Sequence, residues 1–222
     1  MSNRPAPRAY APPPADALTV EYIDTDIVVA NKPSGLLSVP GRGDDRQFSA
    51  LAILTERYGE TFVVHRLDMD TSGLIIFARN REAQSELSRR FEAKAVEKRY
   101  LAKVLGTPID DAGRITLAIG RRWEDRPARC IDEISGKPAE TRWQVKHRGD
   151  HASLLEITPL TGRTHQIRLH LAAIGHPILG DRLYGTVDSV DDRLFLHASA
   201  LALEHPRSGK PLTFESPAPF AQ

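Results

Sequence analysis

The chain has 222 residues, of which 41% are hydrophobic and 27% are charged, and its formal net charge is +1. This composition is ordinary for a globular protein with a substantial core, and the charge argues neither for nor against a polyanionic partner. The single cysteine, Cys130, excludes an internal disulfide and a zinc site built from several cysteines. The sequence contains no signal segment and no apolar run of membrane-spanning length, so we expect a cytoplasmic protein without a membrane partner.

The N-terminal part of the sequence predicts a tail, a hairpin and a helix in that order. Residues 1–17 are rich in Pro and Ala and have no periodic apolar face, which indicates a disordered or extended tail. Residues 18–22 alternate and residues 27–31 are apolar, so the two segments predict a hairpin across an Asp-containing turn. Residues 49–58 have apolar side chains at helical spacing, with Ser49 as the N-cap.

The most informative stretch is residues 63–78, in which an apolar approach leads through a polar turn and Gly73 into a second apolar run. This pattern predicts a buried strand that begins directly after a turn carrying Arg66, Asp68 and Asp70. Polar turns attached to rigid strands often carry chemistry. The alternative is a purely structural turn in which Arg66 and Asp68 form an ion pair.

The middle of the chain predicts a helix over residues 82–93, a strand over 98–106 that carries Tyr100, and two strands over 141–147 and 153–158. Between these strands, residues 107–138 indicate turns and a hairpin. This region holds an arginine cluster that is either a solvated surface or a face that contacts phosphates: Arg121, Arg122, Arg126 and Arg129.

Residues 159–171 lead into a third predicted helix, with Thr164 as its cap and its end at Gly175, just before Pro177. Arg163 lies at the mouth of this helix and Arg168 one turn inside. An Arg on a largely apolar helix needs a carboxylate partner, because an unpaired buried charge is costly, and Asp68 is the natural candidate. The elements together predict one α+β domain over residues 18–222, with a mixed and mostly antiparallel central sheet flanked by helices and loops.

Several of these segments resemble a known family. Residues 65–68 followed by 71–74 are similar to the signature motif of the RluA-type pseudouridine synthases. Four further segments resemble the same family in the same order, namely residues 31–41, 98–100, 162–168 and 175–181. The resemblance covers about residues 18–217 and is nearest to the short members, which lack an N-terminal S4 RNA-binding domain and modify tRNA and 23S rRNA. We therefore expect no S4 domain before residue 18.

The resemblance implies an isomerase that converts specific uridines to pseudouridine in structured RNA, in a tRNA anticodon stem-loop, in 23S rRNA or in both, without cofactor or metal. It implies that Asp68 is the catalytic carboxylate, which either attacks the substrate or removes a sugar proton, that Arg168 pairs with it, and that Tyr100 stacks on the target base. It also implies RNA-contacting residues: Arg66, which fills the space left by the flipped base, His65, Arg163 and His165.

Three alternatives stay open at the level of sequence. The same scaffold accommodates a non-catalytic RNA-binding or chaperone protein. A hydrolase using Asp68 and Asp70 needs two carboxylates on opposite sides of a glycosidic bond, and residues two apart on a turn are poorly placed for that. His65, Asp68 and Asp70 also have ligand chemistry for a metal, although no second cluster accompanies them. We expect a monomer.

Overall fold

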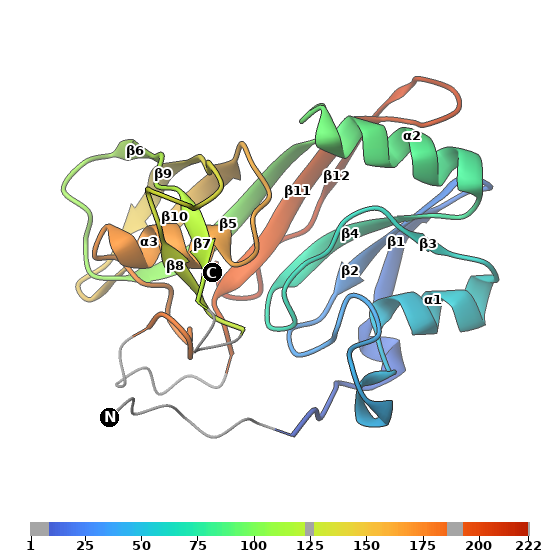
Figure 1. Cartoon of the computed structure of the whole chain (residues 1–222), viewed down its shortest axis with the longest axis horizontal. Coiled ribbons are helices and arrows are strands. Elements are labelled where there is room, and N and C mark those ends of the chain that lie inside the picture. The colour runs from blue at the N-terminus through green and yellow to red at the C-terminus, as the bar shows by residue number, and fades with distance from the viewer. Residues whose placement is uncertain (1–8, 123–126, 186–192, 222) are drawn as a thin grey trace.

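The computed structural model describes residues 9–122, 127–185 and 193–221 (Figure 1). Its centre is a 10-stranded sheet in which eight strands follow the order β1-β2-β4-β11-β5-β10-β9-β6, while β12 pairs with β11 and β3 with β4. The strands of this sheet are β1 Thr19–Ile23, β2 Ile27–Lys32, β3 Phe62–Val63, β4 Ser72–Ala78, β5 Glu97–Leu105, β6 Ala112–Ile115, β9 Thr141–Arg148, β10 Ala152–Pro159, β11 Leu196–Glu204 and β12 Pro211–Glu215. All its pairs are antiparallel except β4 with β11, which confirms the predicted α+β fold with a mixed, mostly antiparallel sheet.

Three α-helices lie among the described residues: α1 Ala50–Tyr58, α2 Arg81–Glu92 and α3 Gln166–Ala173. The predicted cap of α1 is confirmed, because the Ser49 hydroxyl accepts a bond from the Ala52 N–H at 3.3 Å. Asn80 caps α2 in the same way through the Ala83 N–H at 2.8 Å. In Figure 1, α1 and α2 accompany the β1-β2-β4 part of the sheet, whereas α3 lies with β9 and β10 in the other part. None of these helices is long and apolar enough to cross a membrane.

A separate two-stranded sheet pairs β7 (Ile119–Arg121) with β8 (Arg129–Ile131). It confirms the hairpin expected within residues 107–138, and its register places Arg121 opposite Arg129. Arg126 lies outside the described residues.

Residues 9–17 differ from the expected disordered tail. Ala15–Ala17 form a 3-10 helix, η1, and Arg57 of α1 donates to backbone carbonyls at its two ends at 2.7 and 3.0 Å. The Tyr10 hydroxyl donates to the Phe48 carbonyl at 2.8 Å and accepts from the Leu37 N–H at 3.1 Å. The ordered chain therefore begins before residue 18, because these polar contacts replace the missing apolar pattern. Residues 1–8, the rest of the predicted tail, lie outside the described residues.

The register at the middle of the sheet brings distant parts of the sequence together. Ala198 of β11 pairs with Gly73 of β4 on one side and with Tyr100 of β5 on the other. Gly73 has φ +109, and a Cβ at this position would lie 2.3 Å from the Ala198 carbonyl oxygen. The loop that precedes β4 and the side chain of Tyr100 therefore meet at the junction between the two halves of the sheet.

Candidate active site

The loop that carries Asp68, residues 64–71, is fixed by the segment that follows β2. The Ser38 hydroxyl donates to the Leu67 carbonyl at 2.8 Å and accepts from the Leu67 N–H at 3.1 Å. The Ser34 hydroxyl donates to the backbone carbonyl of Asp70 at 2.7 Å. These bonds lie on both sides of Asp68 and hold its backbone in one place.

Lys32 supports the same loop from inside the protein. Its side chain is fully buried, and its ammonium group donates to the carbonyls of Pro33, Leu36 and Met69 at 3.0, 2.7 and 2.9 Å. Burial lowers the pKa of Lys32 to about 7. From the sequence, a lysine next to Pro33 would be expected to be a surface charge or a phosphate ligand. The three carbonyls instead stabilise Lys32 in the protein interior.

Arg168 joins two carboxylates, one from the loop and one from the segment after α3. Its guanidinium lies 3.1 Å from Asp68 Oδ2 and makes two bonds of 2.8 Å to the carboxylate of Asp181. The structure thus confirms the predicted pairing of Asp68 with Arg168. Burial opposes ionisation of Asp181, yet its bonds to Arg168 hold the pKa of this carboxyl below its usual value.

Asp181 is the residue that sequence reasoning missed. Its carboxylate is completely buried and also accepts the backbone N–H groups of Leu183 and Tyr184 at 2.9 and 3.2 Å. The signal was present, because a guanidinium has five donors and a single carboxylate such as Asp68 satisfies only part of them. A second acidic residue near Arg168 was therefore to be expected.

Tyr100 lies close enough to Asp68 and Arg168 for the charge of Asp68 to affect the pKa of its phenol. The side chain is almost buried on β5. Burial is the main cause that raises the pKa of the phenol above its usual value, and the negative charge of Asp68 is the second. Tyr100 is therefore a neutral phenol at physiological pH. Asp68, Tyr100 and Arg168, which the sequence placed in one site, are brought together by the structure.

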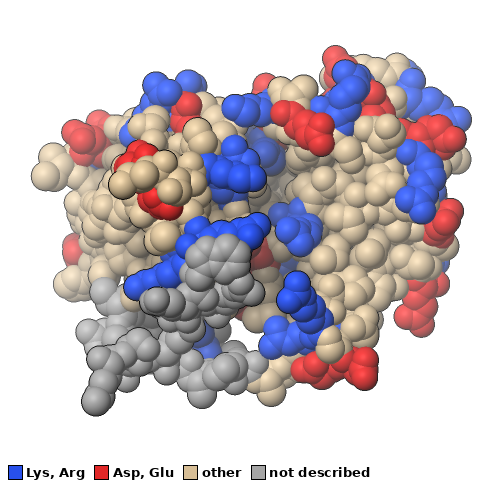
Figure 2. Space-filling model, in the orientation of Figure 1, with Lys and Arg blue, Asp and Glu red and all other residues tan. Residues whose placement is uncertain are grey.

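The three side chains line a cavity of about 1020 Å³. Among the described residues, four further cations line it: Arg66, Lys94, Lys98 and Arg163, against one further carboxylate, Glu92. Figure 2 shows Lys and Arg side chains gathered on both sides of the hollow in the middle of this face. The cavity has apolar walls, a carboxylate bonded to an arginine, and a basic rim. This combination fits a ligand with an aromatic group that enters the cavity and anionic groups that contact the rim.

His65 and Arg66 have different surroundings although they are adjacent. The His65 ring stacks on Phe91 with centroids 4.5 Å apart, and its Nε2 accepts the Ile76 N–H at 3.1 Å. Burial, with the charge of Lys98, lowers the pKa of His65 to about 3, so the ring is neutral and serves structure. Arg66 is exposed, and within the described chain it makes no ion pair with Asp68, contrary to the structural alternative.

The start of α3 differs from the prediction. The helix begins at Gln166, and its N-cap is His165 in a left-handed conformation (φ 58) instead of Thr164. The Gln166 side chain accepts the Arg163 N–H at 3.0 Å and so fixes the segment before the helix. Arg163 is exposed and donates to the Pro138 carbonyl, whereas the side chain of His165 is only 9% exposed and faces Asp68.

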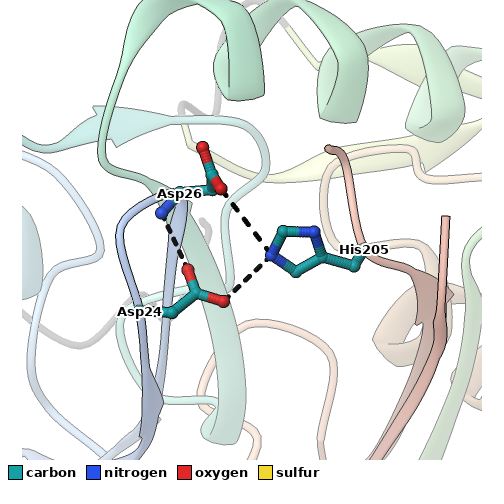
Figure 3. A group of neighbouring side chains, drawn as sticks. All are labelled: Asp24, Asp26 and His205. Atoms are coloured by element: carbon teal, nitrogen blue, oxygen red, sulfur yellow. Dashed lines mark hydrogen bonds and ion pairs between the residues drawn. The ribbon is translucent and has the colours of Figure 1, made fainter. Parts of the chain in front are cut away.

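A second cluster, shown in Figure 3, has ligand chemistry for a metal: Asp24, Asp26 and His205. Its polar atoms already have partners within the protein. Asp24 accepts the N–H groups of Asp26 and Ile27 and a bond from His205, whose other nitrogen accepts two backbone N–H groups. Asp26 accepts two bonds from Arg207, whose positive charge occupies the place of a cation. The cluster therefore ties the β1–β2 turn to the β11–β12 turn.

Comparison with known proteins supports one family. A family model described as RNA pseudouridylate synthase matches residues 26–173. The chain is 41% identical over 214 residues to the dual-specificity RNA pseudouridine synthase RluA of Escherichia coli (strain K12), covering 95% of this chain and 98% of that protein. It is 43% identical over 215 residues to the protein of the same name from Pasteurella multocida, covering 96% and 98%.

Solved structures agree. The human RNA pseudouridylate synthase domain containing 1 is 34% identical and superposes with a TM-score of 0.79, covering 95% of this chain and 87% of that one. These matches confirm the resemblance that the five sequence motifs carry.

Proposed function

This chain belongs to the RNA pseudouridylate synthase family and isomerises uridine in RNA to pseudouridine, and we propose that its substrates are the tRNA anticodon stem-loop and 23S rRNA. Relatives that are 41 to 43% identical are named dual-specificity enzymes, and this chain covers 98% of their length, which supports two classes of RNA substrate here. Family membership also favours catalysis over a non-catalytic RNA-binding protein and over hydrolysis by Asp68 and Asp70.

Asp68 is the proposed catalytic carboxylate, and its ion pair with Arg168 is the observation that carries the assignment. A carboxylate that attacks the sugar or removes a sugar proton has to be held in a fixed position, and the guanidinium at 3.1 Å holds it through a charge-assisted hydrogen bond. Tyr100 is the proposed platform for the uracil, because an aromatic face holds a base while leaving it free to turn. The reaction is an isomerisation without net change of atoms or electrons, and in line with the family resemblance we propose no cofactor or metal.

The basic rim is the proposed contact with the RNA backbone. The target uridine has to leave its stack to reach Asp68 at the bottom of the cavity. Arg66 is exposed and without an ion pair in the described chain, so it is free to occupy the vacated space in the RNA. Lys94, Lys98 and Arg163 line the same cavity and meet the flanking phosphates. His65 supports this surface through its stack on Phe91. We place this enzyme in the cytoplasm as a monomer.

The test of the substrate assignment is the release of tritium from C5-labelled uridine, since C5 loses its hydrogen when the base is rejoined through carbon. Transcripts of an anticodon stem-loop and of a 23S rRNA fragment are compared with versions in which the reactive uridine is replaced by cytidine. We expect release from both wild-type transcripts and none from the replaced ones. Release from only one transcript would contradict dual specificity, and release from neither would overturn both substrate assignments.

A further inference from the structure

His165 lies beside Asp68 in a backbone conformation that histidine rarely adopts. Its φ is 58, it begins α3 without a side-chain capping bond, and its Nε2 is 3.9 Å from Asp68 Oδ2. A residue other than glycine is strained when its φ is positive, and such strain persists where the surrounding structure requires it. Because the backbone at the helix start gains no capping bond from this residue, the reason for the strain lies in where the imidazole is directed.

Tyr184 fixes the proton on this imidazole. The phenol oxygen accepts the Arg129 N–H at 2.7 Å and lies 2.9 Å from His165 Nδ1. Among the described residues Nδ1 is the acceptor within reach of the phenol hydrogen, which favours donation by the hydroxyl to this nitrogen. Burial lowers the pKa of His165 and outweighs the charge of Asp68, which raises it, so the ring is neutral. Its one hydrogen is then on Nε2, directed toward Asp68.

The contacts of Asp68 are all made by one of its two oxygens. Arg168 lies 3.1 Å from Oδ2, and His165 Nε2 approaches the same atom. Oδ1 has no hydrogen bond or ion pair within the described chain, and the side chain is 25% exposed at the cavity. The two oxygens of Asp68 are therefore not equivalent.

We propose that His165, held by Tyr184 as the Nε2–H tautomer, is a positioning residue that fixes Oδ2 of Asp68 together with Arg168 and leaves Oδ1 as the oxygen that acts on the substrate. The inference rests on the proposed role of Asp68. At 3.9 Å the imidazole is just beyond hydrogen-bond distance, and bonds of this kind tighten when substrate is bound. Two donors on one oxygen define the plane of the carboxylate, whereas one donor leaves it free to rotate.

Two substitutions of His165 separate this role from a structural one. His165→Asn keeps a residue that tolerates positive φ, with an amide that reaches toward Tyr184 but is too short to reach Asp68. His165→Gln has the length to place an N–H near the position of Nε2. We expect kcat of His165→Asn to fall about tenfold, as for a lost bond to a charged group, with KM for RNA within about twofold. His165→Gln should recover most of kcat.

Tyr184→Phe tests the tautomer without changing His165. Side-chain ¹⁵N NMR of the wild type should show a protonated Nε2 and an unprotonated Nδ1. In Tyr184→Phe the Nδ1–H form should appear, with a kcat between those of the wild type and His165→Asn. A wild type that is protonated on Nδ1 would overturn the proposal. So would a His165→Asn variant with full kcat and a raised KM, the result expected of an RNA contact.

Asp68→Asn is measured in the same series. If it is inactive while His165→Asn has full kcat, the inference about His165 fails alone. If Asp68→Asn is fully active, the proposed role of Asp68 fails, and the inference about His165 fails with it.

Discussion

Arg168 and Asp181 form a buried bidentate ion pair, with both nitrogen–oxygen distances at 2.8 Å and side-chain exposures of 5% and 0%. The third contact of the guanidinium is Asp68, so Asp181 determines the orientation in which Arg168 meets the proposed catalytic carboxylate. An arginine paired only with Asp68 would be free to rotate about its terminal bonds. Because Asp181 fixes Arg168, the folded protein holds the positive charge of Arg168 at one position beside Asp68.

Replacing Asp181 by Asn should therefore affect stability and activity together. Removing this partner leaves the buried guanidinium with only its single ion pair, to Asp68, among the described residues, and we expect the free energy of unfolding to fall by about 3 kcal/mol. Denaturant unfolding measures this change. Glu215→Gln is the control, because Glu215 pairs with Arg99 on the surface, where its side chain is 70% exposed. A loss of less than about 1 kcal/mol in Asp181→Asn would show that the pair is not needed for the fold.

Gly73→Ala should disrupt the junction between the two halves of the sheet. A Cβ at Gly73 would lie 2.3 Å from the Ala198 carbonyl oxygen, and φ is +109, so the strands have to separate. We expect a loss of about 3 kcal/mol in the free energy of unfolding. Gly162→Ala is the matched control, since a Cβ built there has no atom of the described residues within 4 Å apart from its chain neighbours. Equal stability of the two variants would contradict the close packing of β4 against β11.

How far the sequence determines this structure depends on how local each interaction is. The helix α1 and its Ser49 cap follow from residues within four positions of one another and were predicted correctly. The pairing of Asp68 with Arg168 spans 100 residues, yet it followed from the cost of an unpaired buried arginine. Local spacing and the need for charge compensation were therefore sufficient for these features.

Other features depend on tertiary contacts that no local pattern encodes. The parallel pairing of β4 with β11 joins residues more than 120 positions apart. Lys32 is buried because three carbonyls converge on it, although a lysine next to Pro33 in a loop reads as a surface charge. The N-cap of α3 is His165 instead of the better capping residue Thr164, and the His165 side chain contacts Tyr184 and faces Asp68, which are tertiary contacts.

Stability should decrease in acid because His197 is buried in its neutral form. Burial lowers the pKa of His197 from 6.5 to about 4. Between these values the unfolded chain binds a proton that the folded protein does not, so the free energy of unfolding falls as the pH falls, by about 3 kcal/mol over the range.

Unfolding measured from pH 7 to pH 4 tests this dependence. In His197→Asn the free energy of unfolding should fall less steeply with decreasing pH than in the wild type. The exposed His147→Asn is the control and should keep the wild-type slope. Parallel curves for His197→Asn and the wild type would contradict the assignment.

Lys98 should bind RNA phosphate. It lines the cavity two residues before Tyr100 on the same strand, and it has no ion pair with any described residue. Lys98→Gln should raise KM for RNA and reduce the slope of log affinity against log salt by about one, as for one lost phosphate contact. Lys210→Gln removes an exposed charge on the β11–β12 turn and should leave both unchanged. An unchanged salt slope in Lys98→Gln would exclude the contact.

The most direct test of the account compares Asp68→Asn with Asp70→Asn in tritium release from C5-labelled uridine, with RNA binding measured in parallel. Both substitutions remove one negative charge from the same loop, but only Asp68 is in contact with Arg168. We expect release by the wild type and Asp70→Asn, and no release by Asp68→Asn although it still binds RNA. Tritium release by Asp68→Asn at the wild-type rate would contradict the central role of this carboxylate.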